Sequence, residues 1–290
     1  MIRKLLAILP LAISSAAFAA NSSSEGSEYM HQAPAGKWEV TPAIDYHDYT
    51  AKVSSGAKTD VSGLSYGVKG EYGINDMFSA GIALSVSNDK WKPNSSSSQN
   101  ASGLNNIDIY GLGKYDLGMG LLRYGLDFSI STSKVKIDST SSLPSNTDNG
   151  ASWLTPFIGW EMAMGPGIFG AKFSYAFQLT DRSYDNSSKE KGINAESLSA
   201  FYEWQADQAW SLGLSLAWNS VNGSKDETGA KTSMGHAGLF VDLYAPITIA
   251  QDILLIPNVG WGDDGNTTFF GTNTNTVQKW NVGVAARFTF

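Results

Sequence analysis

The sequence of 290 residues predicts an all-β protein: a transmembrane antiparallel up-and-down β-barrel of about twelve strands. Three observations support this fold class. Apolar and polar residues alternate along most segments between turns, long and short connections alternate along the chain, and the last segment ends on an aromatic residue. In a membrane barrel, alternate residues of each strand contact lipid and lumen, so alternation is expected without long apolar runs.

The connections between the predicted strands alternate in length. Long extracellular loops and short periplasmic turns produce this order, with an even strand count and both termini in the periplasm. The long polar connections are Ala51–Asp60, Asn88–Gly103, Ser133–Gly150, Asp181–Asn194, Ser220–Ala230 and Gly262–Thr276, and the short ones are Gly73–Asp76, Asp116–Gly120, Ala163–Gly167, Ala206–Ala209 and Ala245–Gln251.

Charged residues fall on the polar face of the predicted strands, opposite the aromatic and aliphatic face. A lipid-facing Arg or Lys at mid-bilayer costs about 2–4 kcal/mol, so a membrane would enforce this exclusion. Two strands are weaker, because Leu112 and Phe157 stand on their nominally polar side. We expect the charged residues to line a pore: Lys37, Glu39, Asp45, Lys69, Glu71, Asp108, Lys114, Arg123, Asp127, Glu161, Lys172, Glu203, Asp242, Lys279 and Arg287.

Aromatic residues gather near the ends of the predicted strands, as in the girdles at the two membrane interfaces. A soluble β-sandwich would give the same alternation, but not these girdles or the ordered loop lengths. The periplasmic girdle would contain Trp38, Tyr72, Phe78, Tyr115, Trp160, Phe169, Trp204, Trp210 and Phe290, and the outer one Tyr46, Trp218, Trp261 and Trp280.

The chain divides into three predicted parts. Residues 1–19 have a charged start, an apolar run and a small-x-small site at Ala17–Ala19, which is typical of a secretory signal peptide. Residues 20–36 are expected to be a short polar periplasmic segment, and residues 37–290 the transmembrane β-barrel.

The amino-acid composition limits the classes of binding partner and of chemistry that we expect. The chain has no cysteine, and therefore no disulfide framework or thiol chemistry. Its 27 acidic residues outnumber its 20 basic ones, which argues against nucleic acid. No cofactor is expected. No metal site is expected either, because the histidines are isolated and no calcium-loop pattern appears.

The terminal strand alternates strictly from Val277 to Phe290. Trp280, Phe288 and Phe290 lie on its apolar face, and this ending resembles the C-terminal signature of Gram-negative outer-membrane β-barrels of the porin-like class. The resemblance implies a location in the outer membrane, contact with its lipid, and recognition of this strand by the barrel-assembly machinery.

Catalytic patterns are sparse. Asp45-x-His47 and Asp263-Asp264 loosely resemble the acids and histidine of omptin proteases, without that family's further motifs. An outer-membrane phospholipase would need a serine motif near a histidine such as His236, and none stands there. An autotransporter translocator resembles this chain in size and ending, but only the short segment 20–36 stands where a passenger would be. The sequence therefore predicts a protein that is not an enzyme.

One strand shows a local family resemblance. Gly103-Leu104-Asn105-Asn106-Ile107-Asp108-Ile109, followed by Gly113-Lys114-Tyr115, resembles a Gly-Leu-Gly-Asp-Ile…Lys-Tyr strand of the phenol meta-pathway transporter family, with Asn105 and Asn106 in place of Gly-Asp. The resemblance implies uptake of small, aromatic compounds.

Two classes of function remain for the predicted barrel: transport of solutes and a structural role. Seven basic and eight acidic residues face the predicted lumen, which allows a narrow pore of weak selectivity or a salt-bridged plug. A barrel of twelve strands is intermediate in diameter between narrow barrels filled by side chains and wide barrels that hold an open channel. We favour a narrow passive channel for small hydrophilic solutes. The alternatives are a closed structural or adhesive barrel that acts through its extracellular loops, and an outer-membrane hydrolase.

Overall fold

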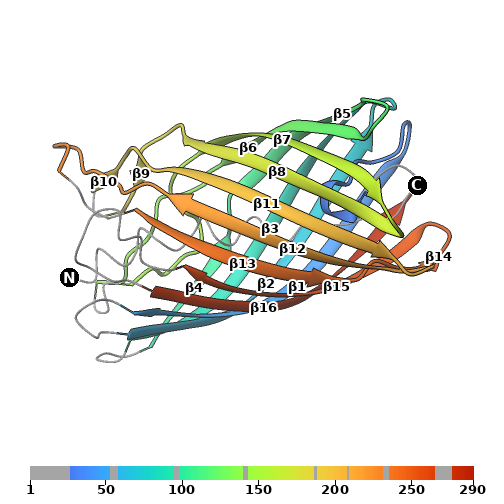
Figure 1. The fold of residues 1–290 in the computed structure, drawn as a ribbon. Coiled ribbons are helices and arrows are strands. Elements are labelled where there is room, and N and C mark those ends of the chain that lie inside the picture. Colours follow the sequence, from blue (N-terminus) through green and yellow to red (C-terminus); the bar gives the residue numbers. More distant parts are fainter. Residues whose placement is uncertain are drawn as a thin grey trace.

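Twelve antiparallel strands close into a barrel in the computed structural model, which describes residues 27–52, 58–93, 98–139, 143–185, 188–207, 209–230, 235–264 and 276–290 (Figure 1). Within them no helix is long and apolar enough to cross a membrane. The predicted signal peptide lies outside the described residues. The barrel strands are β1 (Trp38–Lys52), β2 (Lys58–Gly73), β3 (Phe78–Pro93), β5 (Ile107–Asp116), β6 (Leu121–Ile130), β7 (Trp153–Met164), β8 (Gly167–Gln178), β11 (Asn194–Gln205), β12 (Ser211–Val221), β13 (His236–Tyr244), β15 (Ile253–Asp264) and β16 (Thr276–Thr289).

Each barrel strand pairs with its neighbours in sequence, and β1 closes the barrel by pairing with β16 from Glu39–Thr289 to Lys52–Thr276. The short turns and the C-terminus lie at one end of the barrel, and the long connections at the other (Figure 1). We refer to these as the periplasmic and the outer end. Short additional elements are β4 (Gln99–Leu104), which pairs with β3, β14 (Ile247–Ala250) in the last turn, and the hairpin of β9 (Arg182–Ser183) and β10 (Lys189–Glu190).

Strands extend into two of the predicted loops. β1 continues to Lys52 and β2 begins at Lys58, inside the predicted loop Ala51–Asp60. Likewise β3 runs to Pro93 and β4 occupies much of Asn88–Gly103. These strands extend because their cross-strand pairing continues, and because their inner faces bury an apolar cluster. That cluster contains Tyr49, Val61, Trp91 and Ala101, with Leu143 of an outer loop packed against them.

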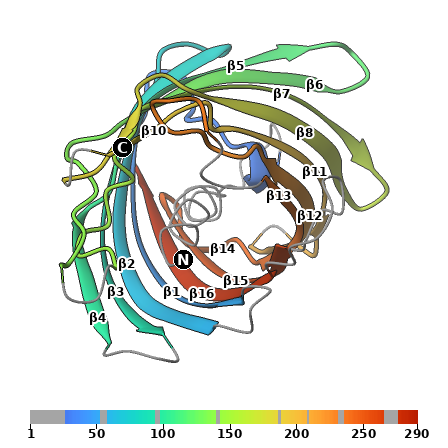
Figure 2. The same ribbon diagram turned by 90° about the vertical axis from the view of Figure 1, so that its left-hand side faces the viewer.

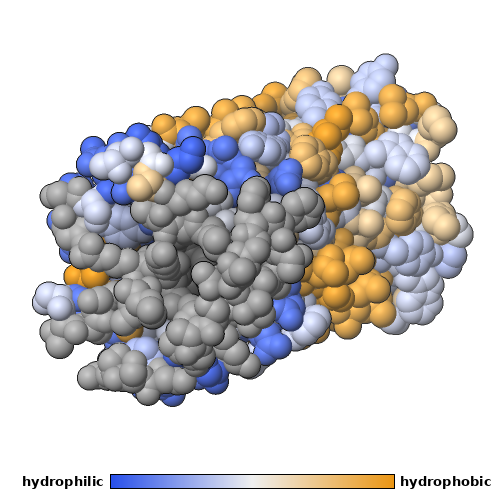
Figure 3. All heavy atoms as spheres, turned by 60° about the vertical axis from the view of Figure 1, so that its left-hand side comes forward, coloured by the Kyte–Doolittle hydropathy of each residue, from blue (hydrophilic) through white to orange (hydrophobic). Residues whose placement is uncertain are grey.

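The outside of the barrel is apolar, as a lipid-facing surface must be. Figure 3 shows hydrophobic residues over the middle and right-hand part of the side wall, and hydrophilic ones toward the left-hand part. Aromatic side chains of the two predicted girdles are exposed, among them Trp38, Tyr115, Trp204, Trp210 and Phe290 at the periplasmic end and Trp218, Trp261 and Trp280 toward the outer end. The predicted fold class is therefore confirmed.

The N-terminal segment, Ser27 to Gly36, differs from the expectation of a periplasmic extension. Ser27 and Glu28 are buried against side chains of strands on different sides of the barrel, so the segment lies inside the lumen. In Figure 2, which looks along the barrel, the blue helical turn of this segment lies within the ring of strands. The polar composition that suggested a solvated segment instead matches a polar barrel interior.

Candidate functional site: the occupied lumen

The N-terminal segment begins with a single 3₁₀ turn, Glu28–Met30. The Ser27 hydroxyl oxygen caps this turn by accepting a hydrogen bond from the Met30 N–H, at 3.3 Å. Gly36, with φ 72°, turns the chain into β1, and its N–H donates to the Gly73 carbonyl at 2.7 Å. The segment is thus held at the periplasmic end by backbone contacts with β2 and then turns inward.

Four glutamates on the inner wall bind this segment: Glu39 of β1, Glu71 of β2, Glu161 of β7 and Glu203 of β11, called here the luminal glutamates. Each is buried. Glu161 accepts from the Ser27 N–H and hydroxyl at 3.1 and 2.6 Å. Glu203 accepts from the Glu28 N–H, and Glu71 from the Ala33 N–H, both at 2.8 Å.

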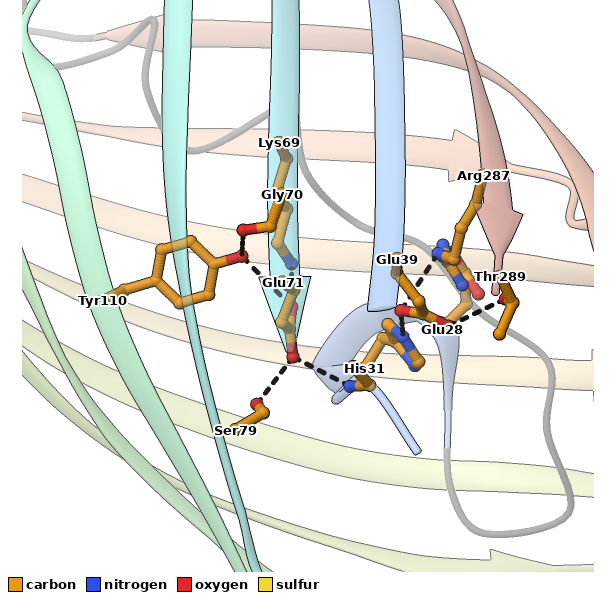
Figure 4. A network of polar contacts seen from close by, with 11 residues as sticks. Glu28, His31, Glu39, Lys69, Gly70, Glu71, Ser79, Tyr110, Arg287 and Thr289 are labelled. Atoms are coloured by element: carbon orange, nitrogen blue, oxygen red, sulfur yellow. Dashed lines mark hydrogen bonds and ion pairs between the residues drawn. The ribbon is translucent and has the colours of Figure 1, made fainter. Parts of the chain in front are cut away.

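The fourth, Glu39, contacts His31 Nε2 (Figure 4). Because the four glutamates come from strands distributed around the wall, the segment spans the lumen. It does not lie along one side.

Cations from the wall pair with three of the four luminal glutamates, Glu39, Glu71 and Glu161. Arg123 of β6 pairs with Glu161 at 2.5 Å, and Lys69 of β2 pairs with Glu71 at 2.7 Å. Arg287 of β16 lies 2.9 Å from Glu28 and 3.6 Å from Glu39, and so joins the segment to the wall (Figure 4). Pairing lowers the cost of burying these charges, although Glu28 Oε2 and Arg287 Nη1 have no hydrogen-bond partner among the described residues.

Aromatic packing supplements the polar contacts. The Tyr29 ring stacks on Phe201 of β11 with centroids 4.7 Å apart, and on Tyr244 of β13 at 6.5 Å. The Tyr244 hydroxyl also donates to Glu203 at 3.2 Å. Stacked pairs of this kind add about 0.5–1.5 kcal/mol beyond their burial, so they stabilise the docked segment.

Burial changes the acidity of the segment's titratable groups. Desolvation raises the pKa of the Glu28 carboxyl to about 8, although the adjacent Arg287 opposes the shift. Desolvation also lowers the pKa of His31 well below its ordinary value, and the surrounding cations, Arg287 first, act in the same direction. Both groups are therefore held neutral more readily in the lumen than in water.

Beyond the segment, the lumen contains a cavity of about 440 Å³. The segment lines one side of it with Tyr29, Met30, His31 and Gln32. Three lysines of the lumen lie over aromatic rings: Lys172 is 4.5 Å from the centroid of Phe157, Lys69 4.9 Å from Tyr110, and Lys279 5.9 Å from Phe240. The cavity is thus walled by charges of both signs together with aromatic surface.

The charged residues expected on the inner face have the following positions. Asp45, Lys69, Asp108, Arg123, Asp127, Lys172 and Lys279 line the cavity, and Glu39, Glu71, Glu161, Glu203 and Arg287 surround the N-terminal segment. Asp242 lies beside Lys279, and Lys114 acts electrostatically on His31. Lys37 precedes β1 and is exposed at the periplasmic end, so it lies apart from the cavity.

Leu112 and Phe157 line the cavity, which explains the weak alternation of β5 and β7: the inner wall is not uniformly polar. Sequence reasoning missed the contributions of Ser27, Glu28, Tyr29, Gln32, Asp89 and Glu196. Asp89 was hidden in a predicted loop, and the N-terminal residues show no strand periodicity. No pattern in the sequence marks them as luminal.

The sequence predicts that His47 pairs with Asp45, but its nearer carboxylate partner is Asp89. His47 Nε2 lies 3.0 Å from Asp89 of β3, and its Nδ1 lies 3.9 Å from Asp45. Asp263 lies on β15, opposite Leu239 and Gln278 in the sheet. In the described part of the chain, no group of three histidine or acidic side chains is arranged to hold a metal ion.

The terminal residues lie where β16 closes on β1. Trp280 packs against Tyr46 with ring centroids 5.3 Å apart, and Phe288 is opposite Val40. Phe290 is 67% exposed, while its N–H donates to the Trp38 carbonyl at 2.9 Å. A role as an assembly signal stays a prediction.

Solved structures share this architecture. A COG4313 outer membrane channel from Pseudomonas putida F1 is similar with a TM-score of 0.70 at 10% identity, covering 93% of this chain and 100% of that one. The transport unit of the autotransporter AIDA-I from Escherichia coli has a TM-score of 0.55 at 11% identity, covering 98% and 96%.

The translocator domain of the autotransporter NalP from Neisseria meningitidis has a TM-score of 0.53 at 13% identity, covering 86% and 87%. No family model and no curated protein matches the sequence. The chain has the fold of Gram-negative outer-membrane β-barrels, a fold used by channels and by translocators. An outer-membrane location agrees with this fold and with the apolar outer surface.

Proposed function

We propose that this protein is a passive outer-membrane channel for small hydrophilic solutes. The observation that carries the proposal is the cavity of about 440 Å³ inside the barrel, walled by charged, small polar and aromatic side chains from strands around it. Small wall residues such as Ser65, Ser85, Ser129 and Ser174 leave room for water and solute. Similarity in fold to an outer membrane channel supports the proposal.

In this proposal the N-terminal segment is the constriction. Its contacts with the luminal glutamates are polar and replaceable by water, whereas the barrel wall is held by continuous strand pairing. Segments that lie outside the hydrogen-bonded strand ladders open at lower free energy than core strands. Solute passage therefore depends on the position of this segment, and fixing it in place should reduce conductance.

A cross-link tests the proposal. The chain has no cysteine, so Tyr29→Cys with Phe201→Cys gives two unique thiols on groups that stack in the lumen. A short bis-thiosulfonate reagent should join the segment to β11. In planar bilayers, we expect conductance before cross-linking, a large loss after it, and recovery on reduction. The control is the Tyr29→Cys single variant treated with the same reagent.

Conductance that is unchanged by a completed cross-link would show that solutes do not depend on the segment's movement. A complete lack of conductance in the wild-type protein, in the uncross-linked variant and in a variant lacking residues 27–33 would contradict the channel itself.

A closed barrel that acts through its outer loops is the second candidate, and the order of one outer loop favours it. The Asp148 carboxylate accepts hydrogen bonds from the Ser131 and Thr132 hydroxyls and from the N–H groups of Thr132, Ser133 and Gly150, at 2.6–2.9 Å. These hydrogen bonds order the loop, and an ordered outer loop can present a binding surface. Lack of conductance together with retained surface binding would support this candidate.

A further inference from the structure

We propose that the cavity beside the N-terminal segment binds small organic cations through their ammonium groups. The inference rests on the proposed function in taking the cavity as part of a solute path, and it names the class of solute. It follows from two charge clusters in the wall, from their positions in the barrel, and from buried polar atoms that lack partners.

The first cluster contains Asp108 of β5, Asp127 of β6 and Lys172 of β8. All three line the cavity. Asp108 and Asp127 lie close enough to repel each other, and Lys172 attracts Asp127. Lys172 also lies over the Phe157 ring. Asp108 has the Ser129 hydroxyl as its hydrogen-bond partner. The cluster therefore contains two carboxyl groups and one ammonium group, a formal excess of one negative charge.

The second cluster contains Asp45 of β1, Asp242 of β13 and Lys279 of β16. Lys279 attracts both carboxylates, and these repel each other. Asp45 accepts a hydrogen bond from the Asn281 amide at 3.1 Å, and Asp242 one from the Ser215 hydroxyl at 3.5 Å. This cluster also has two carboxylates for one ammonium group.

The two clusters face one another across the lumen. Around the barrel, β5 to β8 carry the first cluster, and β13, β15, β16 and β1 span the second. They are separated by β2 and β3 on one side and by β11 and β12 on the other. A solute in the cavity therefore meets two carboxyl groups for each ammonium group on opposite walls.

The other cations of the cavity wall do not offset this excess. Lys69 and Arg123 also line the cavity, but they lie at 2.7 and 2.5 Å from Glu71 and Glu161. Their charges balance Glu71 and Glu161, two of the luminal glutamates that hold the N-terminal segment. Asp89 and Glu196 add further carboxylates to the cavity lining.

Two buried side chains that line the cavity have polar atoms without partners among the described residues. His47 is 1% exposed, and its Nδ1 makes no hydrogen bond. When the ring donates its Nε2–H to Asp89, Nδ1 is left as an acceptor 3.9 Å from Asp45 Oδ1. An ammonium group, with three donors, fits this pair of acceptors.

Gln32 of the N-terminal segment, 7% exposed, likewise has an amide whose oxygen and nitrogen are both without partners. Because a buried polar group without a partner costs free energy, a ligand that satisfies these atoms gains affinity. The cavity therefore combines negative charge with unused acceptors.

Calorimetry on the purified full barrel tests the proposal with 1,4-diaminobutane as the probe and succinate as a probe of similar length and opposite charge. We expect binding of the diamine and none of succinate. Asp45→Asn and Asp108→Asn should each weaken diamine binding about tenfold, the order expected when a hydrogen bond to a charged group is lost. Asp252→Asn removes an exposed carboxylate in the last turn and is the matched control.

Bilayer measurements separate this inference from the proposed function. A potassium chloride gradient should give a reversal potential that favours cations, and Asp45→Asn with Asp108→Asn should reduce it. Conductance without cation preference and without diamine binding would overturn the inference and leave the channel intact. Diamine binding without any conductance would overturn the channel and keep the binding site. Equal binding of succinate would also overturn the inference, and heat-modifiable gel mobility of each variant verifies its folding.

Discussion

At the residue scale, Glu28 links the docking of the N-terminal segment to pH. Its carboxyl is buried among Arg287 of β16, Glu203 of β11, Glu39 of β1 and Tyr244 of β13. The pKa is about 8 in the lumen and near 4.5 in water. Between these values the docked segment holds a proton that a released segment would lose, so rising pH weakens docking.

His31 acts in the opposite sense at lower pH. Burial keeps its pKa well below the usual value of 6.5, so a released histidine gains a proton as pH falls below 6.5 and a docked one does not. Docking therefore weakens on acidification through His31, and of these two groups only Glu28 still changes its protonation above pH 6.5.

We therefore predict that the N-terminal segment is released more often as pH rises from 6.5 to 8. The change in docking free energy has an upper limit of about 2 kcal/mol, from one proton over this interval. Protease cleavage near residue 33 should become faster over the same range, as should conductance if the segment is the constriction. Glu28→Gln should flatten both profiles. An identical slope in Glu28→Gln would assign the effect to another group.

Gly73 offers a second test at the residue scale. A Cβ at this position would overlap the carbonyl oxygens of Pro34 and Ala33, where the segment crosses β2. Gly73→Ala should therefore displace the segment, raise its protease sensitivity and increase conductance. Gly70→Ala lies on the same strand with nothing within 4 Å and is the matched control. Equal effects of the two variants would mean that general weakening of β2 is the cause.

The sequence predicted the inner face well because a strand has a period of two, so one apolar residue fixes the side of every other residue. Glu71 and Arg123 follow directly from this rule. Glu28 and Gln32 do not, because their burial depends on Arg287, Glu203 and the cavity wall, which are distant in sequence. A short polar segment carries no signal that separates a solvated tail from one docked in a polar lumen.

At the element scale, strand ends were harder to predict than strand phases. The Ser- and Asn-rich hairpin between β3 and β4 has the composition of a loop, yet Asn88 pairs with Ser102 and Trp91 with Gln99. Inward packing of Trp91 against Tyr49, with rings 6.4 Å apart, stabilises these strands beyond the apolar band. Such cross-strand packing outweighs local propensity and is invisible without knowing the register.

The last strand, β16, carries a prediction about assembly. Deleting Phe290 removes an exposed terminal aromatic residue together with the backbone hydrogen bonds that it exchanges with Trp38. We expect less folded barrel in the outer membrane and unchanged export across the inner membrane, measured by heat-modifiable gel bands and by signal-peptide processing. Tyr115→Ala removes a similarly exposed girdle residue from β5 and should leave barrel levels nearly unchanged. Full barrel levels after deletion of Phe290 would contradict the assembly role.

At the scale of the whole molecule, a β-sheet in the outer membrane must close on itself into a barrel. An open sheet would expose unpaired N–H and C=O groups to lipid, where each costs several kcal/mol. Here β1 pairs with both β2 and β16, and β13 with both β12 and β15, so the sheet returns on itself. The polar groups then face either a partner strand or the lumen, and the apolar side chains face outward.

This closure predicts a strongly cooperative barrel. No strand can leave without breaking two ladders, such as the long pairings of β1 with β2 and with β16, so unfolding in detergent should face a high kinetic barrier. The unheated protein should migrate differently from the boiled protein in dodecyl sulfate gels, and its circular dichroism should be that of β-structure. The N-terminal segment is not part of these ladders, so a variant lacking residues 27–33 should keep the same heat-dependent shift. Loss of the shift in that variant would mean that the segment holds the barrel together, and a helical spectrum for the wild type would contradict the barrel.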